Sequence, residues 1–528
     1  MVLSSQETID QFRTLQAQLG DRWHLLEGED NADVDILVVP SFSVDQQELQ
    51  KIDGFLHYEE RLLFTLIRLR NPRTRLIYVT SQPLPPIVID YYLQLLPGIP
   101  FSHARDRLLL VPIHDQSLKP LSQKILERPR LMERIRNSLR PDHAYMVCFN
   151  STPLERELSV QLDIPLMAAD PELLYWGTKS GSRQIFAECG IPHPDGSDLV
   201  KTVDDLAQEA ALLWSRQPQL QRMVVKLNEG FSGEGNGILG LTSLAPKLGD
   251  SPSVAERMNL LQAHLPSLVF ESATETWAHY AARIPILGAI VEAYIEGKPK
   301  HSPSFQGAVL PSRQVEALST HDQILGGPNH QIYLGCRFPA QEGYRLQLQE
   351  LGLKVGQNLA EKGVLERFGV DFVAVQTQDG ATWEVQAIEI NLRKGGTTHP
   401  FMTLKLLTNG HYDTATGLFS GQKGTPKYYV ASDNLQKGAY HGLLPNDLMD
   451  IIAEHHLHFN SGNETGTVFH LMGCLSEFGK VGLTSIGNSP EEADQIYRHV
   501  AEVLDAETQP HDVSHPTMPL AWCLGQER

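Results

Sequence analysis

The middle of the chain carries a series of segments whose order restricts the fold more than any other feature. A lysine lies in a strand-like run at 224–227, and a glycine-dense loop follows at 230–240. An acidic strand end comes next at 291–297, and the series closes on Glu389-Ile390-Asn391-Leu392-Arg393. Carboxylate and amide oxygens are hard ligands of the kind that Mg²⁺ takes together with substrate phosphates. A lysine, a backbone cradle and a metal cage, in that order, predict an ATP site.

The length and charge of the chain limit the classes of protein to consider. At 528 residues the chain is too long for one core, so we expect two to four domains. The formal charge of −19 argues against a nucleic-acid partner, because nucleic-acid binding relies on a basic face. An acidic surface still admits amine-bearing substrates.

The cysteines and the termini indicate a reducing cytoplasm. The five cysteines are scattered and none forms a C-x-x-C pair, so we expect neither a disulfide framework nor a structural zinc. The first 12 residues lack a signal pattern, and no apolar run reaches the roughly 18 residues that a membrane helix needs. We therefore expect a cytoplasmic protein with no membrane partner.

Residues 1–165 are expected to form a domain of their own with a parallel sheet. Strand-like runs are separated by helical stretches of the length that a parallel sheet requires. No phosphate-binding glycine signature follows the first run, so a scaffold or a substrate-side domain is the favoured interpretation. The strand-like runs are 35–40, 75–80, 107–111 and 145–149.

Residues 166–430 hold the candidate site. A helix is predicted to begin near Lys179 and to stop at Gly190. A helical stretch over 255–283 is broken at Pro266, and another helix is expected over 351–368, ending at Gly369. Two strands, 370–376 and 382–390, are predicted to form a hairpin through Gln378-Asp379-Gly380.

The last part of the chain, 431–528, is predicted to be a small α+β domain. Helices are expected over 446–456 and 490–504, and strands over 467–471 and 480–486.

The glycine-dense loop contains a misleading motif. Gly235, Gly237 and Gly240 match G-x-G-x-x-G, but a dinucleotide-binding motif requires a helix at that point, and a strand-like run follows instead. We expect a hairpin that folds over phosphates and donates backbone N–H groups to them through Gly230, Gly233, Gly235 and Gly237. A plain surface hairpin is the alternative.

Asp371, Glu389 and Asn391 are the candidate metal ligands. Glu389 and Asn391 are two residues apart on one strand, so their side chains leave the same face. Asp371 opens the neighbouring strand, and the two strands can bring the three side chains together. Glu384 is an alternative ligand, less favoured because only Glu389 has an asparagine two residues later.

These motifs resemble the ATP-grasp superfamily over about 166–405. The wording of Ser319-Thr320-His321-Asp322-Gln323, of 333–339 and of 389–400 resembles the pheganomycin-type peptide ligases. The resemblance implies an α/β (α+β) chain with a Rossmann-like pre-ATP-grasp domain, an ATP-grasp domain and a small C-terminal α+β domain. It also implies an ATP-dependent ligase that joins a carboxylate to an amine through an acyl phosphate.

The resemblance also implies roles for individual residues. Lys179 and Lys226 would hold the phosphates, and Asp371, Glu389 and Asn391 would bind Mg²⁺, for which Mn²⁺ could substitute. Arg393 and Arg337 would stabilise the acyl phosphate. The linker would meet adenine largely through its backbone, and Glu296 is a weak candidate for the ribose because Lys298-Pro299-Lys300 stands where the family often has a carboxylate. The linker candidates are Glu292, Ala293, Ile295 and Glu296.

The sequence leaves open the roles of two histidines and two competing functions. His321, beside Asp322, and His399 could each deprotonate the incoming amine or be structural. Glu454-His455-His456-Leu457-His458 does not match H-E-x-x-H, so we expect no zinc there. A kinase of the same fold and a non-catalytic nucleotide-binding module are the competing functions. The expected partners are amino acids or peptides, and a homo-oligomer is left open.

Overall fold

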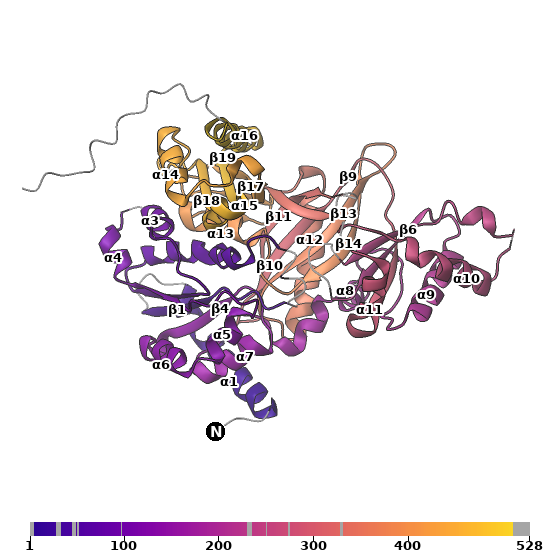
Figure 1. Ribbon diagram of the computed structural model, residues 1–528, viewed down its shortest axis with the longest axis horizontal. Coiled ribbons are helices and arrows are strands. Elements are labelled where there is room, and N and C mark those ends of the chain that lie inside the picture. Colours follow the sequence, from indigo (N-terminus) through magenta and orange to yellow (C-terminus); the bar gives the residue numbers. More distant parts are fainter. Residues whose placement is uncertain are drawn as a thin grey trace, which may run out of the picture.

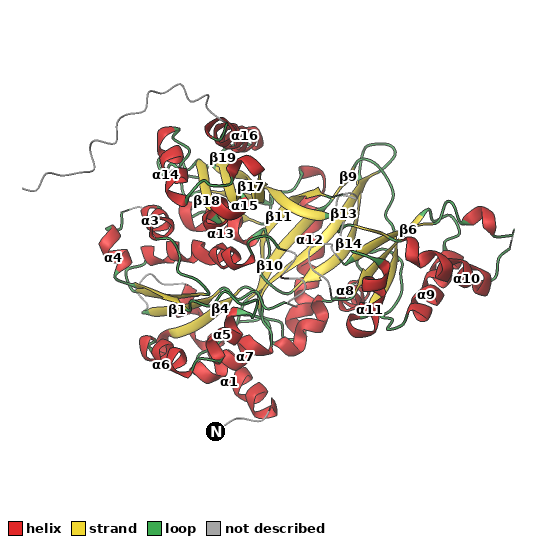
Figure 2. Ribbon diagram, viewed as in Figure 1, coloured by secondary structure: helices red, strands yellow, loops and turns green. Residues whose placement is uncertain are grey.

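The fold is that of a computed structural model (Figure 1), which describes residues 5–27, 33–44, 49, 52–96, 98–229, 235–249, 251–272, 275–327 and 331–509. Helices and strands alternate through the N-terminal part, and one large sheet runs through the middle (Figure 2).

The N-terminal part is a parallel four-stranded sheet in the order β3-β2-β1-β4. Ile36 and Val38 pack in one core with η1 and α3, and Leu37 and Val39 pack in another with α5, α6 and α7. Both faces are therefore covered, as parallel sheets require. The elements are α1 Ser5–Glu27, β1 Val34–Val39, η1 Phe55–Arg70, β2 Thr74–Thr80, α3 Pro86–Gln94, α4 Phe101–Arg105, β3 Leu108–Pro112, α5 Leu121–Leu126, α6 Pro129–Ser138, η2 Pro141–His143, β4 Ala144–Cys148 and α7 Pro153–Leu162.

A second, antiparallel sheet in the order β7-β6-β5-β8 forms the part that extends away from the rest in Figure 1. Its core is built around Trp214, which is 1% exposed. The predicted break at Pro266 in the helical stretch over 255–283 is confirmed, and the break contains a short strand, β7, which the sequence did not predict. Before this second sheet in the chain, η3 Pro171–Gly177 and α8 Lys179–Glu188 pack in the core of the large sheet. The elements of the second sheet and its helices are α9 Val203–Arg216, β5 Arg222–Leu227, β6 Asn236–Gly240, η4 Ala245–Lys247, α10 Val254–His264, η5 Leu265–Ser267, β7 Val269–Phe270, α11 Trp277–Leu287 and β8 Ala289–Ala293.

The large sheet has 11 strands, and its main path is β14-β13-β10-β11-β12-β17-β16-β15. Helix α12 packs on it, and Gly352 permits this because any side chain there would meet the ring of Phe305. The elements are β9 Lys300–His301, β10 Pro303–Val309, β11 Val315–Gly326, β12 Ile332–Phe338, α12 Glu342–Glu361, β13 Glu366–Gln376, β14 Trp383–Asn391, α13 Thr398–Thr408, β15 His411–Asp413, β16 Leu418–Ser420 and β17 Pro426–Gln436.

The predicted helix over 351–368 is wrong at both ends. The helix begins at Glu342 and ends at Glu361, and Gly363, with φ +90°, turns the chain. Gly369 lies inside β13. The predicted hairpin is confirmed, since β13 and β14 pair antiparallel and Gly380 has φ +69° at the turn.

The C-terminal helices and strands agree with the sequence prediction. β17 pairs with β19, and β18 pairs with β19, so this part continues the large sheet. The predicted boundary between 430 and 431 falls inside β17, and the division into domains stays a prediction. The elements are η6 Gly438–Tyr440, α14 Pro445–Glu454, β18 Gly466–His470, η7 Met472–Cys474, α15 Leu475–Phe478, β19 Lys480–Gly487 and α16 Pro490–Glu507.

Across the described ranges, every helix is too short or too polar to cross a membrane.

Candidate active site

A cavity of about 1530 Å³ lies where the parts of the fold meet. It is lined by β5, β8 and the linker after β8, by the large sheet, by η1 of the N-terminal part and by β17 and β19. Ligand sites commonly occupy such junctions. Most of the predicted site residues of the described chain line this cavity: Lys226, Glu292, Ala293, Ile295, Glu296, Arg337, Asp371, Glu389, Asn391 and Arg393.

The three candidate metal ligands lie together at the paired ends of β13 and β14. Asp371 is opposite Glu389 in the antiparallel register, and a bulge follows Asp371. Asn391 Nδ2 donates to Asp371 Oδ2 at 3.0 Å, and Gln323 Nε2 donates to Asp371 Oδ1 at 2.7 Å. The alternative ligand Glu384 is exposed and pairs with Val375, farther along the hairpin. The pairing therefore supports Glu389 as the partner of Asp371.

The charges of Asp371 and Glu389 favour a cation between them. Burial and then the Glu389 charge raise the pKa of Asp371 to about 7, and the positive charge of Arg393 opposes them in part. A divalent cation between the carboxylates would favour their charged forms. No group of three or more His, Cys, Asp or Glu side chains that could hold a metal occurs within the described residues. The candidate set has two carboxylates and the amide of Asn391, and such a set fits Mg²⁺ when phosphate oxygens complete its ligands.

Lys179 reaches the metal-ligand cluster from the first turn of α8. Thr178 caps this helix through its side chain, and Lys179 Nζ donates to Glu389 Oε1 at 2.8 Å. Ser182 on the next turn accepts a hydrogen bond from the Ile390 backbone N–H at 2.9 Å. The helix is thereby fixed against β14, which explains how a residue 210 positions earlier in the chain reaches Glu389.

Lys226 is held by a buried carboxylate. Glu292, 2% exposed, accepts from Lys226 at 2.5 Å through one oxygen and from Arg183 at 2.8 Å through the other. Burial alone would raise the pKa of Glu292, but the two cations outweigh it and the pKa is lowered. The side chain of Glu292 therefore orients Lys226 in the cavity.

The linker after β8 is braced from both sides. Two cations lie near the ring of Tyr294, with Arg222 Cζ at 3.9 Å and Lys300 Nζ at 4.2 Å from its centroid. Glu296 forms a two-pronged ion pair with Arg222, at 2.9 and 2.5 Å. The backbone N–H of Ala293 donates to Asp195 O at 2.8 Å. These contacts fix the linker where it lines the cavity.

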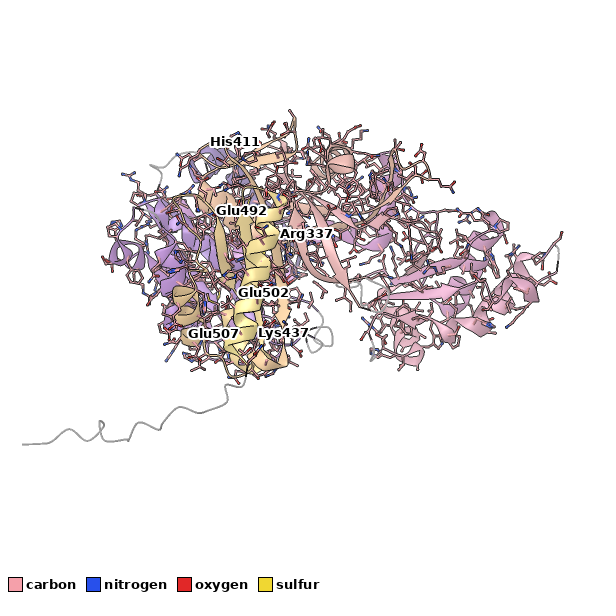
Figure 3. All side chains as sticks on the ribbon, turned by 90° about the horizontal axis from the view of Figure 1, so that it is seen from above. Arg337, His411, Lys437, Glu492, Glu502 and Glu507 are labelled. Atoms are coloured by element: carbon pink, nitrogen blue, oxygen red, sulfur yellow. The ribbon has the colours of Figure 1, made fainter. Side chains whose placement is uncertain are left out.

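The two arginines differ in environment. Arg393 lines the cavity beside the metal ligands, and burial lowers its pKa although the charges of Glu389 and Asp371 oppose this. Arg337 is half exposed and pairs with Asp494 of α16 at 2.8 Å. Figure 3 shows Arg337 beside this helix, so it lies toward the outer part of the cavity.

Neither candidate histidine is among the residues that line the cavity. His321 is fully buried, its Nε2 is 2.6 Å from the Tyr429 hydroxyl, and burial lowers its pKa to about 3. The carboxylate of Asp322 accepts from the Tyr344 hydroxyl and from the Gln341 backbone N–H, so these bonds do not orient His321. His399 is 2.9 Å from Arg61 O, and burial lowers its pKa. A role for His321 in the acceptor site stays a prediction without a supporting contact.

The glycine-dense loop connects two antiparallel strands, as expected. β5 pairs with β6, and Lys226 is opposite Asn236. Gly235 O accepts from Leu227 N at 2.9 Å and from the Tyr280 hydroxyl at 3.0 Å, and Gly237 lies in β6. Gly230 and Gly233 lie outside the described residues.

Sequence reasoning missed the contributions of Arg183, Gln323, Arg61, Tyr58 and Lys480. Arg183 and Gln323 act by contacting Glu292 and Asp371, so no motif of their own marks them. Arg61, Tyr58 and Lys480 reach the cavity from segments far apart in the chain. Only the folded arrangement brings these residues to the site.

Family models and relatives agree on the class of protein. Residues 171–247 and 252–415 match the model described as IQCH-like, ATP-grasp, and residues 447–500 match a PGM1 C-terminal domain. The middle of the chain, over the residues that this first model matches, is therefore an ATP-grasp region. It is similar to the L-propargylglycine–L-glutamate ligase of Streptantibioticus cattleyicolor, with 28% identity over 89% of this chain and 93% of that protein.

Two further relatives are more distant. IQ motif-containing protein H of Danio rerio is 23% identical over 77% of this chain and 42% of that protein. The biotin carboxylase domain of the Hydrogenobacter thermophilus 2-oxoglutarate carboxylase, solved with MgADP and bicarbonate, is 13% identical, with a TM-score of 0.52 over 88% of each chain. This structural likeness shows the fold alone.

Proposed function

We propose that this protein is an ATP-dependent ligase that joins a carboxylate to an amine of small amino acid or peptide substrates. The observation that carries the proposal is the convergence of Asp371, Glu389 and Asn391 with Lys226 and Arg393 on one cavity. The similarity to an amino acid ligase along most of both chains supports the same activity.

The nucleotide would lie between the linker and the metal ligands. Ala293 and Ile295 would contact adenine through their backbone, and Glu296 stands where a ribose hydroxyl would pass. Lys226 would bind a phosphate, since Glu292 already fixes its position. Lys179 would exchange its bond to Glu389 for a phosphate oxygen when the carboxylate takes a cation. The glycine-dense hairpin would cover the phosphates.

Asp371, Glu389 and Asn391 would hold Mg²⁺, and we extend the proposal to Mn²⁺ as a substitute. When bound, the metal neutralises phosphate charge and orients the γ-phosphoryl group. The residues of the chain contribute the rest: Gln323 and Asn391 each hold one oxygen of Asp371 by a hydrogen bond.

The reaction needs positioning and charge neutralisation more than a covalent nucleophile. An oxygen of the substrate carboxylate attacks the γ-phosphorus, and ADP leaves. The amine then attacks the acyl carbon, loses a proton, and phosphate leaves with the electrons of the broken C–O bond. Arg393 lies where it can stabilise the developing negative charge, and Arg337 is the candidate at the outer part of the cavity.

The test is a survey of amino acids and short peptides as acid and amine substrates. A ligase releases phosphate and forms an amide only when ATP, an acid and an amine are all present. A phosphorylated product formed without amine would instead favour the kinase, and binding of ATP without turnover by any pair would favour a non-catalytic module.

We also propose a cytoplasmic location. Cys148, Cys189, Cys336 and Cys474 carry free thiols, which suits a reducing compartment.

A further inference from the structure

One region of the cavity is lined by residues of η1, β17 and β19 that the proposed nucleotide and metal site does not use. This region lies between the N-terminal part and the C-terminal part of the large sheet. We call it the cationic pocket, and its lining residues are Tyr58, Arg61, Asn434, Gln436 and Lys480.

Two cations from opposite ends of the chain meet at one aromatic ring in this pocket. Arg61 Cζ lies 4.0 Å from the centroid of the Tyr58 ring, and Lys480 Nζ lies 5.0 Å from the same centroid. Lys480 also donates to the Tyr58 hydroxyl at 2.8 Å. The two positive charges are therefore held next to the same tyrosine ring, although the repulsion between them opposes this arrangement.

These cations keep hydrogen-bonding capacity that the protein does not use. Arg61 Nη2 donates to Asp433 at 2.5 Å, but its Nε is buried and has no hydrogen-bond partner among the described residues. Lys480 is only 4% exposed, and an ammonium group has three donors. Burying such donors costs free energy unless a ligand or water accepts from them.

The nearby acids offset only one of the two cations. Asp433 pairs with Arg61 and also lies 2.7 Å from His470 Nε2, whereas Lys480 has no acidic partner among the described residues. Glu60 accepts from the Gly473 backbone at 3.1 Å and is 3.6 Å from His57. Asp53 also lines the cavity, but it is exposed to solvent.

Arg393 is near both the pocket and the candidate metal ligands. The charges of Asp371, Glu389 and Arg61 all act on the Arg393 guanidinium. A substrate whose carboxylate meets Arg393 and the γ-phosphate would thus extend its other end toward Arg61 and Lys480.

We propose that Arg61 and Lys480 bind a second carboxylate of the acyl substrate, so that the acid activated by this enzyme is a dicarboxylic acid or an amino acid with an acidic side chain. The inference rests on the proposed function and deepens it. An ammonium and a guanidinium can both donate to one carboxylate, and the low solvent exposure of Lys480 and Arg61 strengthens the attraction.

The first experiment captures the acyl phosphate with hydroxylamine and measures hydroxamate. L-Glutamate is compared with its two monoamides, L-glutamine and L-isoglutamine, and L-aspartate is compared with its own two. Each monoamide keeps one carboxylate for activation and lacks the second. We expect kcat/KM for the diacid to exceed that of either monoamide by at least 10-fold for one of the two sets.

Substitutions connect this preference to the pocket. Lys480→Met keeps the length of the side chain, and it should raise the KM for the diacid by at least 10-fold while the KM for ATP and the monoamide rates change less than 2-fold. Lys480→Arg should restore most of the preference. Lys437→Met is the matched control. Lys437 directly follows β17, the strand that pairs with β19, but it forms an ion pair with Asp505 on the surface. This variant should behave like the wild type.

A binding measurement does not depend on turnover. In the presence of MgADP, glutarate should raise the melting temperature of the wild type more than glutaramate does, and Lys480→Met should abolish the difference. Equal shifts for the two ligands, or an unchanged difference in Lys480→Met, would overturn the inference. Absence of hydroxamate with every acid would count against the proposed function, and the glutarate measurement would still decide the pocket.

Discussion

Glu389 supplies a charge to the proposed metal site, and Glu384 on the same strand does not. Glu389→Gln keeps the size of the side chain and removes one metal ligand charge, so phosphate release should fall roughly 100-fold or more. Glu384→Gln, five residues earlier on the exposed side of the hairpin, is the matched control and should stay near the wild-type rate. Equal rates for the two variants would remove Glu389 from the metal site.

His321 should make the fold sensitive to acid. Its folded pKa, about 3, lies below the usual value of 6.5, so only the unfolded state takes up a proton as the pH falls between these values. The stability that the neutral ring contributes is therefore present above pH 6.5 and is lost as the pH falls, by about 2 kcal/mol at pH 5.

His321→Gln tests this sign. Glutamine can keep a hydrogen bond to Tyr429 but does not titrate. The difference in unfolding free energy between pH 8 and pH 5, measured with urea, should shrink by about 2 kcal/mol in the variant. Unchanged pH dependence would show that His321 does not remain neutral in the fold, and a selective loss of amide formation at pH 8 would instead return it to the acceptor site.

At the scale of elements, the strands and the hairpin of the site followed from local pattern, whereas the helix before them did not. Apolar residues continue from α12 through Val364 and Phe368 into β13, so the pattern alone does not show where the helix ends. The turn at Gly363 separates the two elements, because its positive φ suits glycine. Sequence reasoning placed the stop at Gly369, which is another glycine six residues later.

The glycine-dense hairpin is the element whose behaviour should change with the nucleotide. Ordering glycine backbone costs about 1–2 kcal/mol for each residue, and phosphate contacts would offset that cost. Amide exchange over residues 227–237 should slow when ATP and Mg²⁺ are added. The exchange of β1, which is buried on both faces far from the nucleotide, is the internal control. Identical exchange over the hairpin with and without nucleotide would contradict the proposal that the hairpin covers the phosphates.

At the scale of the whole molecule, the sequence predicts that the candidate metal ligands lie together, but it does not predict the cationic pocket. Asp371, Glu389 and Asn391 come from two adjacent strands, so their sequence spacing carries their geometry. Arg61 and Lys480 are brought together only by the contact between η1 and the C-terminal strands. No local pattern encodes a contact between segments so far apart.

The same contact should couple the ends of the chain in stability. Asp433 of β17 accepts from Arg61 of η1 and from His470 of β18, and all three side chains are nearly buried. Asp433→Asn would leave the Arg61 charge buried without its anion, which typically costs about 3–5 kcal/mol. Asp505→Asn breaks the surface pair with Lys437, and such pairs contribute about 1 kcal/mol or less. Urea unfolding of the two variants should therefore differ by several-fold in the loss of free energy. Similar losses of free energy in the two variants would show that Asp433 does not hold the N-terminal part against the large sheet. Contacts other than the Asp433 ion pair would then position Arg61.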